Sequence, residues 1–200
     1  LDRAKADLFL VLELAGTNEA QAALSLLITD SNLDEMANLR AIVALSGIQT
    51  PTVDTIDSLW STAYGGAVYQ GDARPNTAVL ALGSIAGTLR TATADDAGIT
   101  DQLLGGAFSS SDIKQRAVYL SALGNTGDSS LQPRLLPLLD DPSSRIRRET
   151  AAQLERLGSD QVTQELADHF YKESSGEVRG AIAAALITWE SPTSEMNNAV

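Results

Sequence analysis

One pattern recurs along the sequence and limits the possible folds more than any other feature. An Arg or polar residue is followed by an Ala, by an apolar residue about three positions on, and then by Leu-Gly or a close equivalent. The five copies cover residues 38–47, 76–83, 114–124, 149–158 and 178–187. A repeat of about 30 to 45 residues is typical of stacked helix pairs, because a single pair cannot bury its apolar face without a neighbour.

Second helical stretches lie before and between these copies, with apolar residues at helical spacing and without strand-like alternation. They cover residues 19–28, 53–64, 97–104, 131–139 and 161–171. Aromatic residues make up only 4% of the chain, so its 44% hydrophobic content is mostly small and aliphatic, which suits closely packed helices. We therefore predict an all-α fold, a right-handed α-α superhelix of about 10 to 11 antiparallel helices.

Glycines mark the expected helix ends. Gly16, Gly47, Gly124 and Gly158 stand where a helix would end in a left-handed residue, which glycine adopts without steric cost. The glycine-rich residues 65–75 are expected to form a long loop. We predict one helical-repeat domain over residues 1–190 and a frayed or truncated segment over 191–200, in a chain that begins without Met and is expected to be a fragment of a larger protein.

Residues 138–154 read LLDDPSSRIRRETAAQL, an acidic turn followed by a branched apolar residue, Arg, Ala and Leu. This stretch resembles a HEAT repeat, so the predicted superhelix is a solenoid of the HEAT or armadillo type. In such repeats the Asp typically caps and bonds within its turn, and the Arg reaches a neighbouring turn. The resemblance implies these structural roles for Asp141 and Arg147.

A longer resemblance points to the helical domain of the large lipid-transfer proteins, the family of vitellogenin and the microsomal triglyceride transfer protein. Residues 14–20, 49–59, 78–84 and 122–127 carry it. In that family the helical domain is a two-layered arc that supports lipid-holding β-sheets and offers a surface to partner proteins. The resemblance implies structural support for a lipid carrier.

The repeat pattern and the two resemblances together select a set of structural residues at helix ends and between repeats. They are Gly16, Thr17, Leu82, Gly83, Leu123, Gly124, Asn125, Asp141, Arg147, Leu157 and Gly158.

The formal net charge of -12 argues against nucleic acid and anionic membrane surfaces as partners, because like charges repel at short range. No apolar run approaches the roughly 20 residues that span a bilayer. The chain has no cysteine, which removes disulfides and thiolate metal sites. Only three residues are lysine, a feature that leans towards an extracytoplasmic protein, periplasmic or secreted.

Few residues could carry chemistry. His169, the only histidine, shares a helix face with Glu165, and this pair is read either as a weak metal site or as a solvated acidic face. The pairs at 95–96 and 140–141 are expected to cap helices rather than to act as acids or bases. An arginine cluster that includes Arg145 is a candidate anion site, and Trp60 and Trp189 are expected to pack in the core or between repeats.

The sequence therefore predicts a non-enzymatic scaffold that binds an unknown protein partner, without cofactor or metal. One alternative is a module for lipid transport or lipoprotein assembly, which would meet lipid through the parent protein. The other alternative is a HEAT-like enzyme of the phycobilin-lyase type.

Overall fold

The computed structural model describes residues 2–65, 72–92, 95–96, 98–158 and 162–190. This part of the chain is built from α-helices and two short 3₁₀ helices, with no strand. The elements are α1 (Asp2–Ala15), α2 (Asn18–Ile28), α3 (Glu35–Ser46), α4 (Val53–Gly65), α5 (Arg74–Thr91), α6 (Ile99–Ser109), α7 (Ile113–Asn125), η1 (Ser129–Leu131), α8 (Gln132–Leu135), η2 (Leu136–Asp140), α9 (Ser144–Leu157), α10 (Thr163–Lys172) and α11 (Gly176–Glu190). The prediction of an all-α fold is confirmed.

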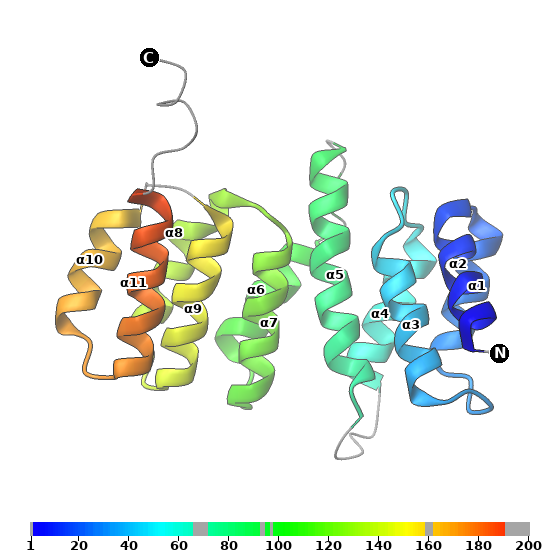
Figure 1. Ribbon diagram of the computed structural model, residues 1–200, viewed down its shortest axis with the longest axis horizontal. Helices are drawn as coiled ribbons and strands as arrows, with labels where there is room; N and C mark the ends of the chain where they lie inside the picture. The colour runs from blue at the N-terminus through cyan, green and yellow to red at the C-terminus, as the bar shows by residue number, and fades with distance from the viewer. Residues whose placement is uncertain (1, 66–71, 93–94, 97, 159–161, 191–200) are drawn as a thin grey trace.

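The helices form a two-layered stack along one axis, from α1 at one end to α10 and α11 at the other (Figure 1). In the first layer each odd-numbered helix packs on the next, from α1 through α3, α5, α7 and α9 to α11. The second layer consists of the even-numbered helices, most of which pack on the odd-numbered helix that follows them. Within this second layer α2 and α4 lie directly beside each other.

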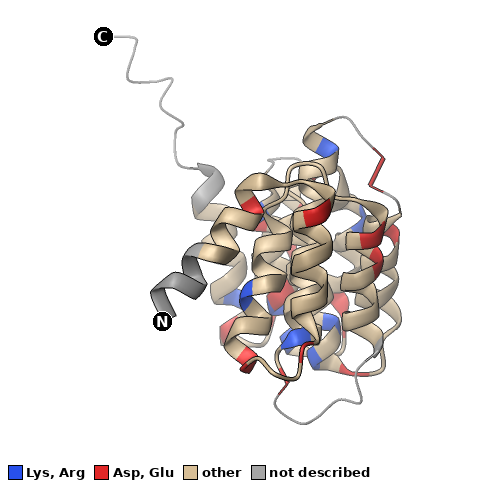
Figure 2. Ribbon diagram, turned by 90° about the vertical axis from the view of Figure 1, so that its right-hand side faces the viewer, with Lys and Arg blue, Asp and Glu red and all other residues tan. Residues whose placement is uncertain are grey.

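The core lies between the two layers and continues along the stack. Leu45 of α3, Leu82 of α5 and Leu123 of α7 are fully buried, at the apolar positions that recur in each repeat. Viewed along the stack, many of the charged residues lie towards the ends of helices and in the turns (Figure 2). The apolar spacing of each helix thus selects the face that it buries against its neighbours.

Helices α5 and α7 approach closely because α5 carries glycine at the contact. A Cβ atom added at Gly83 would collide with the backbone carbonyl of Ala122. One turn further along α5, a Cβ atom at Gly87 would lie 2.8 Å from the carbonyl oxygen of Thr126. Residues with side chains at these two positions would hold the helices apart.

The stretch predicted as helical over residues 131–139 is helical, but it is not one continuous α-helix. That stretch forms the end of η1, the short α8 and η2, with Pro133 near the start of α8 and Pro137 near the start of η2. Proline has no backbone N–H and its ring clashes with the preceding turn, so the second proline prevents one continuous α-helix.

Two of the four predicted left-handed glycines are wrong. Gly16 and Gly158 have φ values of 57° and 54°, as expected. Gly47 has φ of -87°, and Gly124 lies inside α7, whose following turn places Gly127 at φ 60° instead. At Gly47 and Gly124 the side chains of Glu13 and Gln153 respectively lie where a Cβ atom would be, and both are flexible side-chain ends that can move aside.

The predicted loop lies only partly in the described chain: α4 ends at Gly65 and α5 begins at Arg74, while residues 66–71 lie outside the described residues. The predicted terminal segment 191–200 lies outside them as well. The proposed domain boundaries therefore stay a prediction.

Candidate binding groove between helices α2 and α4

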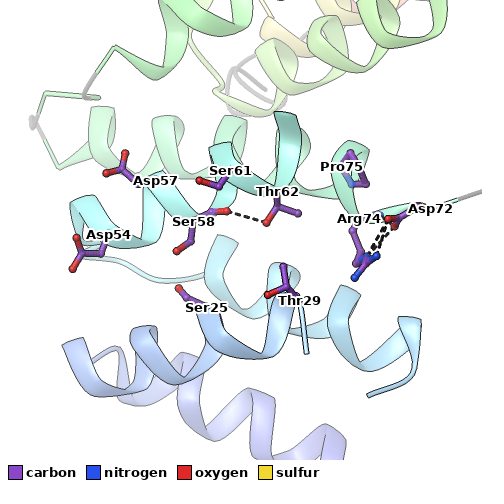
Figure 3. A pocket seen from close by; sticks show the side chains of 10 residues that line it. All are labelled: Ser25, Thr29, Asp54, Asp57, Ser58, Ser61, Thr62, Asp72, Arg74 and Pro75. Carbon is purple, nitrogen blue, oxygen red and sulfur yellow. Dashed lines mark hydrogen bonds and ion pairs between the residues drawn. The ribbon is translucent and has the colours of Figure 1, made fainter. Parts of the chain in front are cut away.

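A polar groove lies between α2 and α4, the neighbouring helices of the second layer. Two adjoining cavities of about 490 Å³ and 390 Å³ form it, and both are lined by Ser25, Asp54 and Ser58. Figure 3 shows the larger cavity, with Ser25 of α2 and Thr29, which directly follows this helix, facing the side chains of α4. The facing residues are mostly Ser, Thr and Ala, so the side chains leave the space between the two helices open.

A buried network of neutral hydrogen bonds, centred on Gln21, joins the two helices that form the groove. The side-chain amide of Gln21 donates to the carbonyl oxygens of Gly16 and Thr50 at 2.9 and 3.0 Å. Its amide oxygen accepts from the backbone N–H of Thr52 at 2.9 Å and from the hydroxyl of Thr55 at 2.8 Å. Because Gln21 is almost fully buried, this network fixes the first turn of α4 against α2.

An ion pair closes one end of the groove. The Arg74 guanidinium donates to both carboxylate oxygens of Asp72, at distances of 2.9 to 3.2 Å. These hydrogen bonds lower the pKa of Asp72 and raise the pKa of Arg74. Figure 3 shows Arg74 turned towards Asp72, with Asp54 at the far end of the groove. The one cationic side chain that lines the groove in the described chain is therefore neutralised within the protein.

Two carboxylates on α4 have no such partner. Asp54 and Asp57 line the larger cavity, are exposed, and form no ion pair with any residue that the structure describes. The hydroxyls of Ser25, Thr29 and Ser61 likewise make no hydrogen bond within the described chain. The groove thus offers unpaired acceptors, and its unneutralised charge is negative.

Helix α4 also carries an aromatic stack, which is not among the residues that line the two cavities. The rings of Trp60 and Tyr64 are parallel to within 7°, with centroids 5.1 Å apart. Trp60 is 8% exposed and Tyr64 is 59% exposed, so the tryptophan supports a tyrosine ring that is open to solvent. Partial burial is the main cause that raises the pKa of Tyr64, which therefore stays neutral at physiological pH. An interaction with the hydroxyl of Tyr119 on α7 also raises the pKa of Tyr64.

The two residues with predicted HEAT roles are Asp141, in the turn before α9, and Arg147, in the first turns of α9. Asp141 accepts from the backbone N–H of Ser143 at 2.9 Å and from the Arg116 guanidinium of α7 at 2.6 Å. Arg147 donates to both carboxylate oxygens of Glu173 at 2.7 and 2.9 Å and to the carbonyl oxygen of Asp141 at 2.9 Å. The hydrogen bonds from Arg147 lower the pKa of Glu173 to about 2.

The other predicted structural residues lie in the core or at helix ends, and none of them lines the groove. Thr17 caps α2 by accepting from the backbone N–H of Ala20 at 3.2 Å, and Asn125 donates to the carbonyl oxygen of Leu80 at 3.2 Å. Leu82, Gly83, Leu123, Gly124 and Leu157 are buried between helices, while Gly16 and Gly158 follow the ends of α1 and α9.

The candidate metal ligands do not come together. His169 contacts the carbonyl oxygen of Glu165 through Nδ1 at 2.7 Å and Asp140 through Nε2 at 3.2 Å. Over the residues with assigned positions, no three His, Asp or Glu side chains are grouped so that they could hold a metal ion. Asp96 caps α6 by accepting from the N–H groups of Gly98 and Thr100.

Two further predictions concern tryptophan and arginine. Trp60 packs in the core cluster as expected, whereas the side chain of Trp189 lies outside the described residues. In the arginine cluster, Arg147 pairs with Glu173 and Arg148 lies 3.6 Å from Glu177, so these two charges are already engaged. The anion site stays a prediction for Arg145 and Arg156.

Comparisons with known proteins support the repeat architecture. The family model for HEAT repeats matches residues 100–187. No curated protein matches the chain. The chain is similar to the crystal structure of an engineered protein from the Northeast Structural Genomics Consortium, with 19% sequence identity, a TM-score of 0.45, and coverage of 94% of this chain and 90% of that chain.

The match to HEAT repeats and the stacked helix pairs confirm the predicted fold class, an all-α helical-repeat superhelix. None of the helices in the described ranges is long and apolar enough to cross a membrane.

Proposed function

We propose that this chain is a non-enzymatic scaffold that binds a protein partner, and that the α2–α4 groove is part of its binding surface. HEAT repeats are generally protein-interaction scaffolds, which supports the class of function. The observation that carries the choice of surface is the groove itself, where Asp54, Asp57 and three hydroxyl groups lack partners within the described chain. Unpaired polar groups on a rigid framework are available for hydrogen bonds across an interface.

Site-specific photo-cross-linking tests this proposal. A photoreactive residue is placed at Ser61 in the groove and, as a matched control, at exposed Val43 on α3 of the first layer. In an extract of the native source we expect a discrete protein adduct at Ser61 that excess unlabelled chain suppresses. The adduct is then identified by mass spectrometry and its binding measured with purified components. If neither position gives a saturable protein adduct, the scaffold function is contradicted.

Lipid transport or lipoprotein assembly is the second proposed function, and it rests on the resemblance to the lipid-transfer proteins. The exposed apolar residues of α1 favour it: Leu8, Leu10, Val11 and Leu14 are 51%, 51%, 60% and 77% exposed. An apolar surface of this kind suits association with another apolar surface. Purification without detergent, followed by lipid extraction and mass spectrometry, is expected to recover bound lipid if this function holds. A lipid-free protein would count against it.

An enzyme of the phycobilin-lyase type is the remaining alternative. Its candidate residues are His169 and Glu165, and the contacts of His169 tie it to Asp140 and to its own helix. Replacement of both candidates with Ala is expected to leave the function of the protein unchanged, and loss of an associated activity would favour the enzyme.

A further inference from the structure

We propose that the α2–α4 groove binds an arginine-bearing extended segment of the partner protein, with Asp54 and Asp57 pairing with its guanidinium groups. This inference rests on the proposed scaffold function and specifies the chemistry of the partner. Its basis is charge: Arg74 is held by Asp72, which leaves two carboxylates of the groove without a cation in the described chain. Guanidinium groups pair with carboxylates through paired, charge-assisted hydrogen bonds.

The cavity near the turn before α11, which also contains several carboxylates, provides a contrast. There Glu173 pairs with Arg147, and the neighbouring Asp141 pairs with Arg116. Those carboxylates hold successive helix pairs together. In the α2–α4 groove the neutral side chain of Gln21 has this structural role, so Asp54 and Asp57 are not needed for stacking. Both carboxylates are therefore available to pair with a cation from outside the protein.

The chemistry of the two carboxylates favours arginine over lysine. A planar guanidinium presents several N–H donors in a fixed fork and can pair with carboxylate oxygens through two parallel hydrogen bonds, whereas a lysine ammonium group acts as a compact point charge. The hydroxyl of Ser61, one helical turn after Asp57 on α4, offers a further acceptor.

The size of the groove fits a short extended segment of protein. From Asp54 to Thr62 the helix rises by roughly 12 Å, which an extended chain of about four residues spans. Asp54 and Asp57 lie one helical turn apart, with Cβ atoms about 5 to 6 Å from each other. Alternate residues of an extended chain are about 7 Å apart and point to the same side, so the sequence Arg-Gly-Arg matches this spacing. The groove hydroxyls can pair with the peptide backbone, whereas nucleic-acid phosphates would be repelled by the carboxylates.

Fluorescence anisotropy with defined peptides tests the inference on the full chain. The probe is a labelled peptide in which Arg-Gly-Arg is flanked by glycines, compared with the Lys-Gly-Lys and Gln-Gly-Gln versions. We expect Arg to bind more tightly than Lys, and Gln to bind at least roughly tenfold more weakly than Arg, with an affinity that falls as salt is added. Equal binding of all three peptides, or no binding of the Arg peptide at low salt, would overturn the inference.

Two double variants separate the groove from the overall charge. Asp54→Asn with Asp57→Asn is expected to weaken the Arg peptide roughly tenfold. The control, Asp101→Asn with Asp168→Asn on α6 and α10, changes the net charge equally and is expected to leave its affinity within about twofold. Equal weakening by both double variants would assign the binding to net charge and overturn the inference. Circular dichroism verifies that each variant is folded.

The failure of this inference can be told apart from the failure of the scaffold function. If the partner cross-linked at Ser61 is captured equally by the Asp54→Asn, Asp57→Asn variant, the scaffold function stands and the arginine assignment is wrong. If spermidine displaces the Arg peptide at a lower concentration than the unlabelled peptide itself, the groove is a site for small polyamines and the inference is overturned. Capture that depends on both carboxylates supports it.

Discussion

The two halves of the helical stack hold their turns together with different chemistry. Towards the N-terminus the turns are joined by buried amides. Gln21 connects the end of α1 to the start of α4, and Asn38 of α3 donates to the carbonyl oxygens of Leu27 and Asp30 at 2.6 and 3.2 Å. Towards the C-terminus, Arg116 and Arg147 reach the acidic turns that follow them. Buried neutral side chains thus join the turns of the N-terminal half, whereas two turns of the C-terminal half are joined by ion pairs between repeats.

This difference explains where the chain resembles HEAT repeats. The family model matches residues 100–187, which include both arginine–carboxylate turns. The N-terminal half stacks in the same way but without those turns. Acidic side chains also differ in role between the halves: Asp141 and Glu173 stabilise turns of the second half, whereas Asp54 and Asp57 in the groove pair with no residue of the described chain.

The first prediction concerns a substitution in the core that both halves share. Leu123 is fully buried in α7 between α5 and α9, so Leu123→Asp would place an unpaired carboxylate between stacked helices. We expect a loss of about 4 kcal/mol or more in the free energy of unfolding, measured by urea denaturation. Val43→Asp introduces the same charge at a site that is 58% exposed and is expected to change stability by less than about 0.5 kcal/mol. A Leu123→Asp variant as stable as the wild type would refute the proposed repeat register.

The second prediction concerns the close contact between α5 and α7, where the two halves meet. Gly83→Ala places a methyl group against the carbonyl of Ala122, and backbone atoms cannot rotate away as a side chain does. We expect destabilisation of about 1 to 3 kcal/mol, measured by urea denaturation, because α5 and α7 must move apart. The control, Gly180→Ala in α11, has open space around the new atom and is expected to be neutral or stabilising by up to about 1 kcal/mol. Equal effects of the two substitutions would show that helix propensity, and not close packing, governs Gly83.

Much of the fold follows from the sequence, because apolar spacing decides which face of a helix is buried. The repeated Ala and Leu positions correctly locate five helices of the first layer, α3, α5, α7, α9 and α11. The break at Pro137 also has a signal in the sequence, but the apolar spacing of residues 131–139 continues across the proline and conceals it. Gly124 is assigned wrongly because a glycine near a helix end can be required for its size or for its backbone conformation, and the sequence alone does not separate these reasons.

The groove could not be predicted from the sequence in the same way. Ser25 and Ser58 stand on different repeats, and only the packing of α2 beside α4 brings them to one cavity. The partners of Gln21 are similarly distant, since Thr52 and Thr55 lie 31 and 34 residues away. Small polar residues at helical spacing are the one available signal, and on a single helix they are typical of an ordinary solvated face.

The third prediction tests the neutral network of the N-terminal half. Gln21→Leu keeps a similar volume but leaves the N–H of Thr52 and the carbonyl of Thr50 without their buried partner. We expect a loss of about 1 to 3 kcal/mol in the free energy of unfolding. Because no ionisable group takes part, the difference from the wild type should stay constant between pH 7 and pH 3 in urea denaturation. A difference that depends on pH would show that a charged group contributes to this network.

The last prediction applies the same measurement to the C-terminal half. The pKa of Glu173 is about 2 in the folded protein, against an ordinary value of 4.5, because Arg147 stabilises the ionised form. A lowered pKa means that the ion pair stabilises the fold fully above the ordinary value and that this stabilisation is lost as the pH falls from about 4.5 through about 2. Glu173→Gln is therefore expected to lower the free energy of unfolding by about 1 to 2 kcal/mol at pH 7, a figure that allows for screening by solvent. This difference in stability from the wild type should shrink as the pH approaches 2.

Paired with Gln21→Leu, this pH dependence distinguishes the two kinds of turn directly. If Glu173→Gln shows a constant difference across the same range, the carboxylate contributes through its shape and hydrogen bonds alone, and the contrast between a neutral and a charged half is wrong. If the difference shrinks in acid only for Glu173→Gln, the two ends of one helical stack respond separately to pH. The C-terminal turns would then weaken in acid, while the Gln21 network keeps its full contribution to stability.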